Sequence, residues 1–395
     1  MKFIQDFLHK VRPNFEKGGK YEKFFYIYEA HETLFFTPAD TTKSQGGVQV
    51  RDAIDLKRMM MTVILAMVPC LLFGIWNVGH QHFLATGEGG AFLDKIIFGA
   101  WYVLPVVVVS YATGLTIEFT FATIRRHEVN EGFLVTGMLI PLIMPPNIPL
   151  WQVALATAFA VILAKEVFGG TGMNILNVAM TARAFLYFAY PTDISGEVWT
   201  VLDGVATVEG YSGATALAIA ASTQAGSVGD AFTSNWNADM FSYSSLFIGT
   251  VPGSIGETST LACLIGAAIL IFSGIGSARI ILTVFFGAYL MGLIFNLAGA
   301  NPFMDMPAHY HWVMGGLAFG AVFMATDPVS GTHTDTGKWI YGLLIGMLTV
   351  LIRVFNPAYP EGIMLAVLLM NVFAPLIDYY VVQSNKKRRL SRATV

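Results

Sequence analysis

Residues 97–124 read IFGAWYVLPVVVVSYATGLTIEFTFATI, and this stretch decides the class of fold. It holds 28 residues, of which only Glu118 carries a charge. An α-helix needs about 20 predominantly apolar residues to cross the hydrocarbon core of a bilayer. The stretch therefore predicts a membrane-spanning helix.

Nine further apolar runs approach the length that a spanning helix requires. With soft boundaries, the ten runs are Met59–Trp76, Ile97–Ile124, Phe133–Pro149, Trp151–Phe168, Ile175–Tyr190, Thr260–Gly276, Ile280–Ala298, His311–Ala325, Trp339–Phe355 and Ile363–Val382. We therefore predict an all-α polytopic membrane protein with about ten transmembrane helices.

The overall composition excludes other classes of protein. Of the 395 residues, 55% are hydrophobic and 12% are charged, whereas a soluble domain carries about 25% charged residues. Disorder requires low hydrophobicity, and 23 basic against 26 acidic residues give no basic footprint for nucleic acid. Cys70 and Cys263 lie in separate apolar runs, and their spacing supports neither a disulfide framework nor a cysteine-bound metal.

The basic residues are concentrated at the two ends of the chain. Ten of the 23 lie within the first 58 residues, and five lie within the last ten. Basic residues that flank membrane spans stay on the cytoplasmic side. We therefore expect both termini in the cytoplasm. This requires an even number of spans, which agrees with ten.

The longest stretch between predicted spans, residues 191–259, contains seven acidic residues and no Lys or Arg. It is expected on the periplasmic side, with five spans before it and five after it. Two homologous halves with an odd number of spans have opposite orientations, as in inverted-repeat transporters. The predicted division is a cytoplasmic segment 1–58, a first five-helix repeat 59–190, the periplasmic loop 191–259, a second repeat 260–383 and a basic cytoplasmic tail 384–395.

Glycine and polar residues interrupt the apolar pattern between residues 165 and 177, which read KEVFGGTGMNILN. Backbone that leaves the helix at membrane depth must line a cavity or be buried in protein, so this break is a candidate site for a planar, hydrogen-bonding ligand. The alternative is a tight turn in which Thr171 or Asn174 caps the next helix. The same alternatives apply to the break from Thr326 to Lys338.

Two acidic residues within predicted spans are candidates for a cation path. Glu118 lies in the second run and Asp378 near the end of the tenth, and a charge near the bilayer centre costs about 2.5–3.5 kcal/mol. Carboxylate oxygen suits a hard cation such as Na⁺. The alternatives are a structural ion pair between Glu118 and Arg183, and a position of Asp378 close to the membrane interface.

The acidic loop contains Glu209-Gly210-Tyr211-Ser212-Gly213-Ala214-Thr215. This stretch resembles the flavinylation motif Asp-x-x-Ser/Thr-Gly-Ala-Thr, whose last Thr is esterified to the phosphate of FMN by a periplasmic flavin transferase. Glu209 stands where the motif has Asp. The resemblance predicts covalent FMN on Thr215, with Ser212, Gly213 and Ala214 as the small residues around the attachment point.

The whole chain resembles the NqrB/RnfD family of bacterial membrane flavoproteins. The leader 1–58 favours the NqrB side of the family over the RnfD side. The matching stretches cover both halves and run through residues 51–58, 126–133, 165–177, 185–191, 211–217, 252–257, 324–330, 353–362 and 387–390.

This resemblance implies noncovalent riboflavin in addition to FMN, electron transfer to ubiquinone, outward Na⁺ transport and a six-subunit assembly. We expect the riboflavin among Gly170, Thr171, Asn174 and Asn177, facing Asp327. The resemblance also places the family's sodium-linked carboxylates at Glu118 and Asp378. The quinone region, a glycine pair in the family, falls on Gly114 and Leu115. The aromatic leader segments 24–28 and 34–36 are expected to lie at the membrane interface or to contact another subunit.

Three functions are compatible with the sequence. The preferred one is a redox subunit of an NADH:ubiquinone oxidoreductase that pumps Na⁺. The alternatives are an RnfD-type subunit of an ion-pumping ferredoxin:NAD⁺ oxidoreductase and a passive channel or transporter, because an inverted repeat does not fix function. Thr215 discriminates against the last, since a channel needs no flavin.

Overall fold

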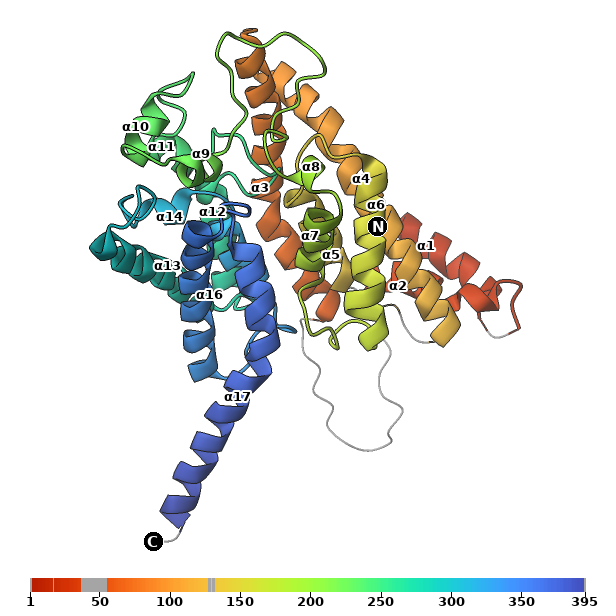
Figure 1. Ribbon diagram of the computed structural model, residues 1–395. Coiled ribbons are helices and arrows are strands. Elements are labelled where there is room, and N and C mark those ends of the chain that lie inside the picture. Colours follow the sequence, from red (N-terminus) through yellow and green to blue (C-terminus); the bar gives the residue numbers. More distant parts are fainter. Residues whose placement is uncertain (1, 17, 37–54, 127–128, 130–131, 394–395) are drawn as a thin grey trace.

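The computed structural model describes residues 2–16, 18–36, 55–126, 129 and 132–393 (Figure 1), and in these ranges every regular element is a helix. The all-α polytopic class is therefore confirmed. The elements are α1 (Lys2–Val11), η1 (Arg12–Asn14), η2 (Glu22–Phe24), α2 (Phe25–Phe35), α3 (Leu56–Thr86), α4 (Phe92–Arg125), α5 (Gly132–Leu142), α6 (Leu150–Ala160), η3 (Val161–Lys165), η4 (Glu166–Phe168), α7 (Val178–Ala189), α8 (Pro191–Ile194), α9 (Ala216–Ser222), α10 (Val228–Thr233), α11 (Tyr243–Ile248), α12 (Thr260–Phe272), α13 (Ala278–Ala298), α14 (Tyr310–Val313), α15 (Leu317–Phe319), η5 (Gly320–Met324), α16 (Asp335–Phe355) and α17 (Ile363–Ala393).

The ten predicted runs take three structural forms. Six described helices are long and apolar enough to cross a membrane: α3, α4, the continuous segment from α6 to η4, α13, α16 and α17. Three others, α5, α7 and α12, have only 11, 12 and 13 residues. The run at 311–325, predicted as one span, is interrupted: α14 ends at Val313, Gly315 has a φ of +62°, and α15 begins at Leu317.

The helices form two groups that lie side by side in Figure 1. In the first group α4 packs against α3, α5 and α6, and α6 packs against α7; in the second, α16 packs against α13 and α17. Contacts of α3 with α12 and of α7 with α17 join the groups. At the first of these contacts the Sγ atoms of Cys70 and Cys263 lie 3.8 Å apart, so tertiary packing brings together two free thiols that are distant in the sequence.

The acidic loop is built from the short helices α8 to α11, which lie at the opposite end of the molecule from the projecting end of α17 (Figure 1). It has its own apolar core, in which Leu217, Phe241 and Leu246 pack against Met314 from the second group. Side chains of Thr215, Ser227 and Ser242 cap α9, α10 and α11 by accepting backbone N–H groups. The loop therefore has a defined structure that rests on the helical domain.

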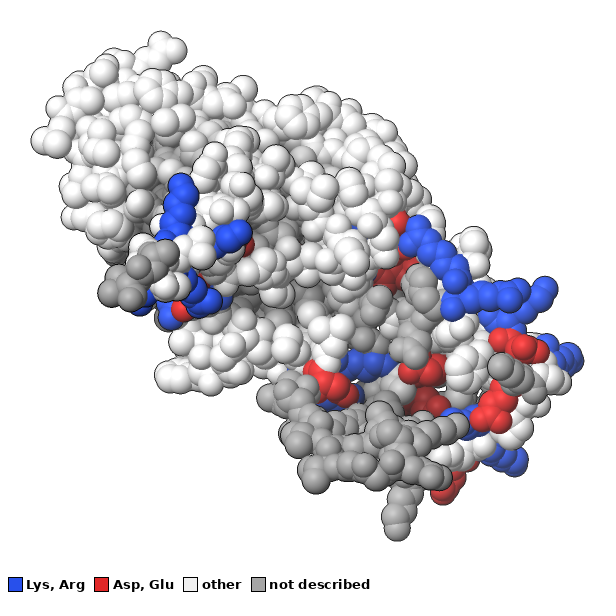
Figure 2. Space-filling view, turned by 90° about the horizontal axis from the view of Figure 1, so that it is seen from below, with Lys and Arg blue, Asp and Glu red and all other residues white. Residues whose placement is uncertain are grey.

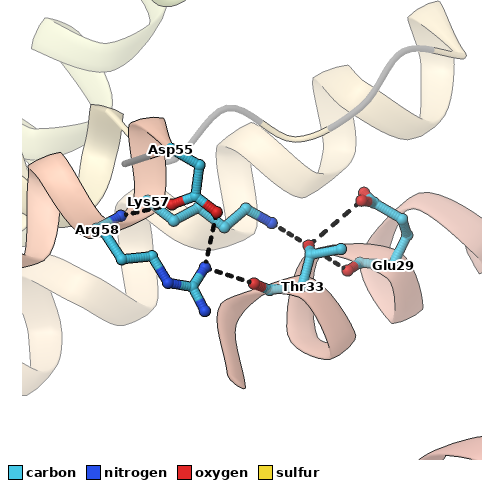
Figure 3. A network of polar contacts seen from close by, with 5 residues as sticks. All are labelled: Glu29, Thr33, Asp55, Lys57 and Arg58. Atoms are coloured by element: carbon cyan, nitrogen blue, oxygen red, sulfur yellow. Dashed lines mark hydrogen bonds and ion pairs between the residues drawn. The ribbon is translucent and has the colours of Figure 1, made fainter. Parts of the chain in front are cut away.

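Polar contacts join the N-terminal segment to the first long helix (Figure 3). Thr33 near the end of α2 donates its hydroxyl to the carbonyl oxygen of Glu29 at 2.7 Å, and Lys57 donates to the same hydroxyl oxygen. Arg58 donates to the carbonyl oxygen of Thr33 at 3.2 Å and to the carboxylate of Asp55 at 3.0 Å. Residues 51–54, part of the stretch that resembles the family, lie outside the described ranges.

The basic end of the chain is a direct continuation of the last membrane helix. α17 runs without interruption to Ala393 and carries the predicted tail residues beyond position 384. Viewed from the end where α17 leaves the bundle, charged side chains gather over part of the face and a wide area is uncharged (Figure 2). This distribution is typical of a protein whose uncharged belt lies in lipid.

Two cavities along helix α7 as the candidate functional site

The predicted attachment residue, Thr215, is held in place by its neighbours. Its hydroxyl oxygen accepts the N–H of Ala218 at 3.3 Å as the N-cap of α9. Ser212 donates to Glu197 at 2.9 Å, and Trp236 donates to the carbonyl oxygen of Ser212 at 3.1 Å. These contacts fix the loop on both sides of Thr215.

Gly213, two residues before Thr215, lies too close to its neighbours to carry a side chain without strain. A Cβ atom at Gly213 would lie 3.1 Å from the carbonyl oxygen of Glu197 and 3.2 Å from the Tyr211 hydroxyl. Both distances are shorter than ordinary van der Waals contact. The Ser-Gly-Ala-Thr order therefore places a hydroxyl at a helix start with little bulk in front of it.

Thr215 borders a cavity of about 780 Å³ of empty space, counting space open to solvent. We name it the Thr215 cavity. Its other walls come from α7, from the acidic loop up to the start of α12, from the break between α14 and α15, and from the connection between α16 and α17. They include Arg183, Tyr187, Trp199, Glu257, Gly316 and Glu361. Ser212, Gly213 and Ala214 support Thr215 and do not line this cavity.

Two carboxylates and an arginine meet in the wall of the Thr215 cavity. Arg183 Nη1 donates to Glu257 Oε2 at 2.6 Å, and both side chains are about 6% exposed. Glu361 accepts the backbone N–H of Gly316. A Cβ atom at Gly316 would lie 2.5 Å from Glu257 Oε1 and 3.0 Å from Glu361 Oε1, so the missing side chain lets both carboxylates approach the same point.

A second buried arginine, Arg353, shapes this wall from behind. Its three donor nitrogens bind carbonyl oxygens: Nε that of Glu361 at 3.0 Å, Nη1 that of His311 at 2.9 Å and Nη2 that of Met314 at 2.8 Å. The side chain is fully buried. Arg353 thus satisfies acceptors that the break between α14 and α15 leaves without helical partners.

A second cavity, of about 860 Å³ of empty space, lies at the other end of α7. We name it the Asn177 cavity. Of the five residues predicted to hold a planar ligand, Thr171, Asn174, Asn177 and Asp327 line it, and Gly170 does not. Residues of α3, α5 and the end of α12 supply apolar walls, among them Met60, Val135 and Leu270.

The polar groups of the Asn177 cavity are only partly engaged with one another. Asn177 caps α7 by accepting the N–H of Met180 at 3.1 Å, so the predicted cap at Thr171 or Asn174 is wrong. Asp327 accepts from Ser330 at 2.8 Å, and the amide of Asn174 donates to the carbonyl oxygen of Leu176 at 3.1 Å. The buried Thr171 Oγ1 has no hydrogen-bond partner among the described residues, and such unpaired buried groups are uncommon in folded proteins.

Two of the helices that end at the Asn177 cavity do so in π-helical turns. α6 passes into η3, which ends at the cavity residue Lys165, and α15 passes into η5, which contains the cavity residue Phe323. Such turns widen the backbone and occur frequently at functional sites. The break at 165–177 and the break at 326–338 therefore meet at one cavity.

The candidate ion-path residues have defined partners. Glu118 pairs with Lys165, and both side chains are about 5% exposed. The alternative of a structural ion pair at Glu118 is therefore present, but its partner is Lys165 and not the suggested Arg183, which pairs with Glu257. Asp378 accepts the backbone N–H groups of His333 and Thr334 at 2.7 and 3.1 Å, which orders the start of α16. The role of either carboxylate in ion movement stays a prediction.

The predicted quinone region lies on α4. Gly114 is buried, and a Cβ atom there would lie 1.8 Å from the ring of Phe133 at the start of α5. Its neighbour Leu115 packs on the main core. Gly114 therefore allows close packing of α4 on α5, and a quinone contact at this point stays a prediction.

Helix α7 borders both cavities. Asn177 and Val178 line one, and Arg183 and Tyr187 line the other. At 1.5 Å rise per residue, Val178 and Arg183 are about 7.5 Å apart along the helix axis. Tyr187 also donates to the carbonyl oxygen of Ala358 at 2.8 Å, which joins α7 to the segment between α16 and α17.

Comparison with known proteins adds a family assignment to this geometry. A model of the NQR2, RnfD, RnfE family matches residues 43–387. The chain belongs to this family. Several full-length relatives are named Na(+)-translocating NADH-quinone reductase, with the subunit designation B: those of Stutzerimonas stutzeri and Ectopseudomonas mendocina are each 50% identical over 98% of this chain and 99% of their own length. That of Chromohalobacter salexigens is also 50% identical, over 98% of this chain and 96% of its own length.

Family membership and geometry together show what sequence reasoning missed. Glu361, Gly316 and Tyr187 were not singled out, although the structure places all three in the wall of the Thr215 cavity. Glu257 was noted only as one of the acidic loop residues. A sequence signal for these two glutamates was available. Each stands next to a glycine, Gly256 before Glu257 and Gly362 after Glu361, and each lies in a segment that resembles the NQR2, RnfD, RnfE family.

Proposed function

We propose that this chain is the membrane flavoprotein subunit of a bacterial Na⁺-translocating NADH:ubiquinone reductase. It would carry FMN esterified to Thr215 and riboflavin in the Asn177 cavity. The observation that carries the proposal is the position of Thr215: the hydroxyl named by the motif borders a cavity whose walls also hold aromatic side chains and a buried arginine. Family membership and the names of the relatives support the same function.

The residues of the Thr215 cavity fit a tethered flavin. Thr215 offers a half-buried hydroxyl at the start of α9, and the small residues before it leave room for a transferase. Tyr187, Trp199 and Tyr359 give the cavity aromatic walls, on which a planar ring system can stack. The flavin transferase is the partner that this maturation step requires.

The residues of the Asn177 cavity fit a noncovalent flavin. The unpartnered Thr171 hydroxyl and the amides of Asn174 and Asn177 offer donors and acceptors, and the rest of the wall is largely apolar. A few convergent polar groups in an apolar pocket are typical of small-molecule sites. Riboflavin has no phosphate and therefore needs no cation to bind it. This agrees with Lys165, the basic residue in this wall, because Lys165 pairs with Glu118.

Flavins supply the one- and two-electron chemistry when they are bound. The chain's own contribution is to hold two such groups close together and away from water. α7 is short enough that both of its ends border a cavity, and its central residues Ala182 and Leu186 are fully buried. We propose that electrons from partner subunits pass along this helix to ubiquinone, with the movement of Na⁺ linked to Glu118 and Asp378.

The proposed setting is the bacterial inner membrane, within a six-subunit complex, with both termini and the basic end of α17 in the cytoplasm. In this orientation the Thr215 cavity lies on the periplasmic side and the Asn177 cavity on the cytoplasmic side. The lack of Lys and Arg between residues 191 and 259 supports it.

Denaturing electrophoresis of the chain tests the proposal. When the chain is produced with the flavin transferase, its band should fluoresce under ultraviolet light, and Thr215→Ala should remove the fluorescence. Thr223→Ala is the matched control, because Thr223 lies in the same loop and its hydroxyl donates within α9; its band should stay fluorescent. A dark wild-type band would contradict the proposal and favour a channel or transporter.

A further inference from the structure

The two buried arginines near the Thr215 cavity differ in what their donors do. Each of the three nitrogens of Arg353 binds a carbonyl oxygen, so three of its five N–H groups support the fold. For Arg183, the described chain provides one hydrogen bond, from Nη1 to Glu257. Arg183 also lines the cavity, and a guanidinium has five N–H donors.

Basic and acidic side chains occur in equal number around this point. They are Arg183 and Arg353, and Glu257 and Glu361, with Glu257 the direct partner of Arg183. Glu361 is held by the N–H of Gly316 and lies in the same wall. Thr258 and Ser254, which also line the cavity, are neutral. Among the described basic side chains, an added negative charge in the cavity would therefore meet Arg183 as the one that lines the wall.

We propose, on the basis of the flavin at Thr215, that the Arg183–Glu257 pair sets the reduction potential of that flavin. The positive charge of Arg183 stabilises the negative charge that the flavin gains on reduction. The negative charge of Glu257 weakens this stabilisation. The electron that reduces the flavin comes from NADH, through the partner subunits of the proposed complex. The guanidinium keeps its proton, and no covalent bond forms or breaks at Arg183 or Glu257.

The physical basis is the burial of the Arg183–Glu257 pair, which lowers the effective dielectric constant around it. Coulomb interactions are several-fold stronger near an effective dielectric constant of about 20 than in bulk water. Both side chains are about 6% exposed, so water and salt screen them little. Loss of the cation must therefore disfavour the reduced flavin, and loss of the anion must favour it.

Potentiometric titration of the covalent flavin in the assembled complex tests this inference. Arg183→Gln should lower the equilibrium constant for reduction at least tenfold, a shift of about 59 mV for one electron. Glu257→Gln should shift the potential in the opposite direction. The double variant Arg183→Gln/Glu257→Gln, which again has a balanced charge, should return toward the wild-type value.

The controls separate this inference from the function on which it rests. Arg183→Lys keeps the charge and should shift the potential less than Arg183→Gln. Arg279→Gln removes an exposed cation that pairs with Asp335, at neither cavity, and should leave the potential unchanged. The absence of covalent flavin from the wild type would refute the proposed function. Covalent flavin whose potential is the same in Arg183→Gln and Glu257→Gln, or moves in the same direction in both, would overturn this inference alone.

Discussion

The two cavities at the ends of α7 have similar volumes and different walls. The Thr215 cavity is bordered by loops and by a charged pair, Arg183 and Glu257. The Asn177 cavity is bordered by helices, two of which end in π-helical turns, and by the breaks at 171–177 and 326–329, which supply neutral hydroxyls and amides such as those of Thr171 and Asn174.

This difference suggests two ways of holding the same kind of group in a membrane. At the Thr215 cavity the Thr215 hydroxyl offers a point of covalent attachment, which would fix the ligand there. At the Asn177 cavity convergent polar side chains in an apolar wall would hold a ligand by hydrogen bonds and shape. The following predictions test this contrast, from the largest expected effect to the smallest.

Arg353→Met should have the largest effect on stability. It would leave the carbonyl oxygens of His311, Met314 and Glu361 buried without these donors, at about 1–3 kcal/mol for each unsatisfied group. Thermal unfolding in detergent should show a loss of at least about 3 kcal/mol. A melting temperature equal to that of the wild type would show that Arg353 does not support the Thr215 cavity.

Glu118→Gln should be the most disruptive change near the Asn177 cavity, because it removes the anionic partner of buried Lys165. Breaking a buried pair by removing one partner costs about 3–5 kcal/mol. In the assembled complex the Na⁺ dependence of quinone reduction should weaken. Glu166→Gln is the control, because Glu166 pairs with the more exposed Arg125. An unchanged Na⁺ response in Glu118→Gln would remove Glu118 from the ion path.

Gly316→Ala should damage the Thr215 cavity, whereas Gly172→Ala should leave the Asn177 cavity intact. The new Cβ at 316 would lie 2.5 Å from Glu257 Oε1, whereas nothing lies within 4 Å of one at 172. The second change costs only the strain of a φ of +90°, about 1–2 kcal/mol. Thermal unfolding and the covalent flavin signal should both fall for Gly316→Ala. Equal losses in the two variants would contradict the contrast.

Thr171→Val and Asn177→Ala should separate ligand binding from folding. Asn177 caps α7, and loss of a cap costs about 1 kcal/mol. Thr171 Oγ1 has no partner among the described residues, so its removal should leave the stability of the apoprotein unchanged. Both variants should release riboflavin more readily, as measured by extraction and chromatography. Full riboflavin retention in Thr171→Val would show that this hydroxyl does not contact the ligand.

Periodicity and composition predicted the elements well where a run was long and uninterrupted. The run at 97–124 became α4, with bounds Phe92–Arg125. The run at 311–325 has similar composition but is interrupted at Gly315, which adopts a left-handed conformation that composition does not reveal. The motif singled out Thr215, and the structure places this residue in a cavity wall. Four of the five residues predicted to hold riboflavin line the other cavity.

Pairings between distant segments were not predictable from one sequence. Arg183 was expected beside Glu118, and it binds Glu257 from the segment before α12. Cys70 and Cys263 are neighbours although they are 193 positions apart in the sequence. Such contacts depend on how the two helix groups pack against each other. The hydrophobic pattern of a helix shows which face is buried, but it does not show which residues of another helix that face contacts. The charged wall of the Thr215 cavity therefore became visible only in the structure.

The central claim is that one flavin is tethered at Thr215 while a second is held without a covalent bond. Flavin analysis of the purified complex tests it directly: the denatured chain is separated from released cofactors, and its intact mass is measured. The account predicts one covalent FMN on the wild-type chain, none on Thr215→Ala, and free riboflavin released from both. Covalent flavin that persists in Thr215→Ala, or a wild-type chain of unmodified mass, would contradict it.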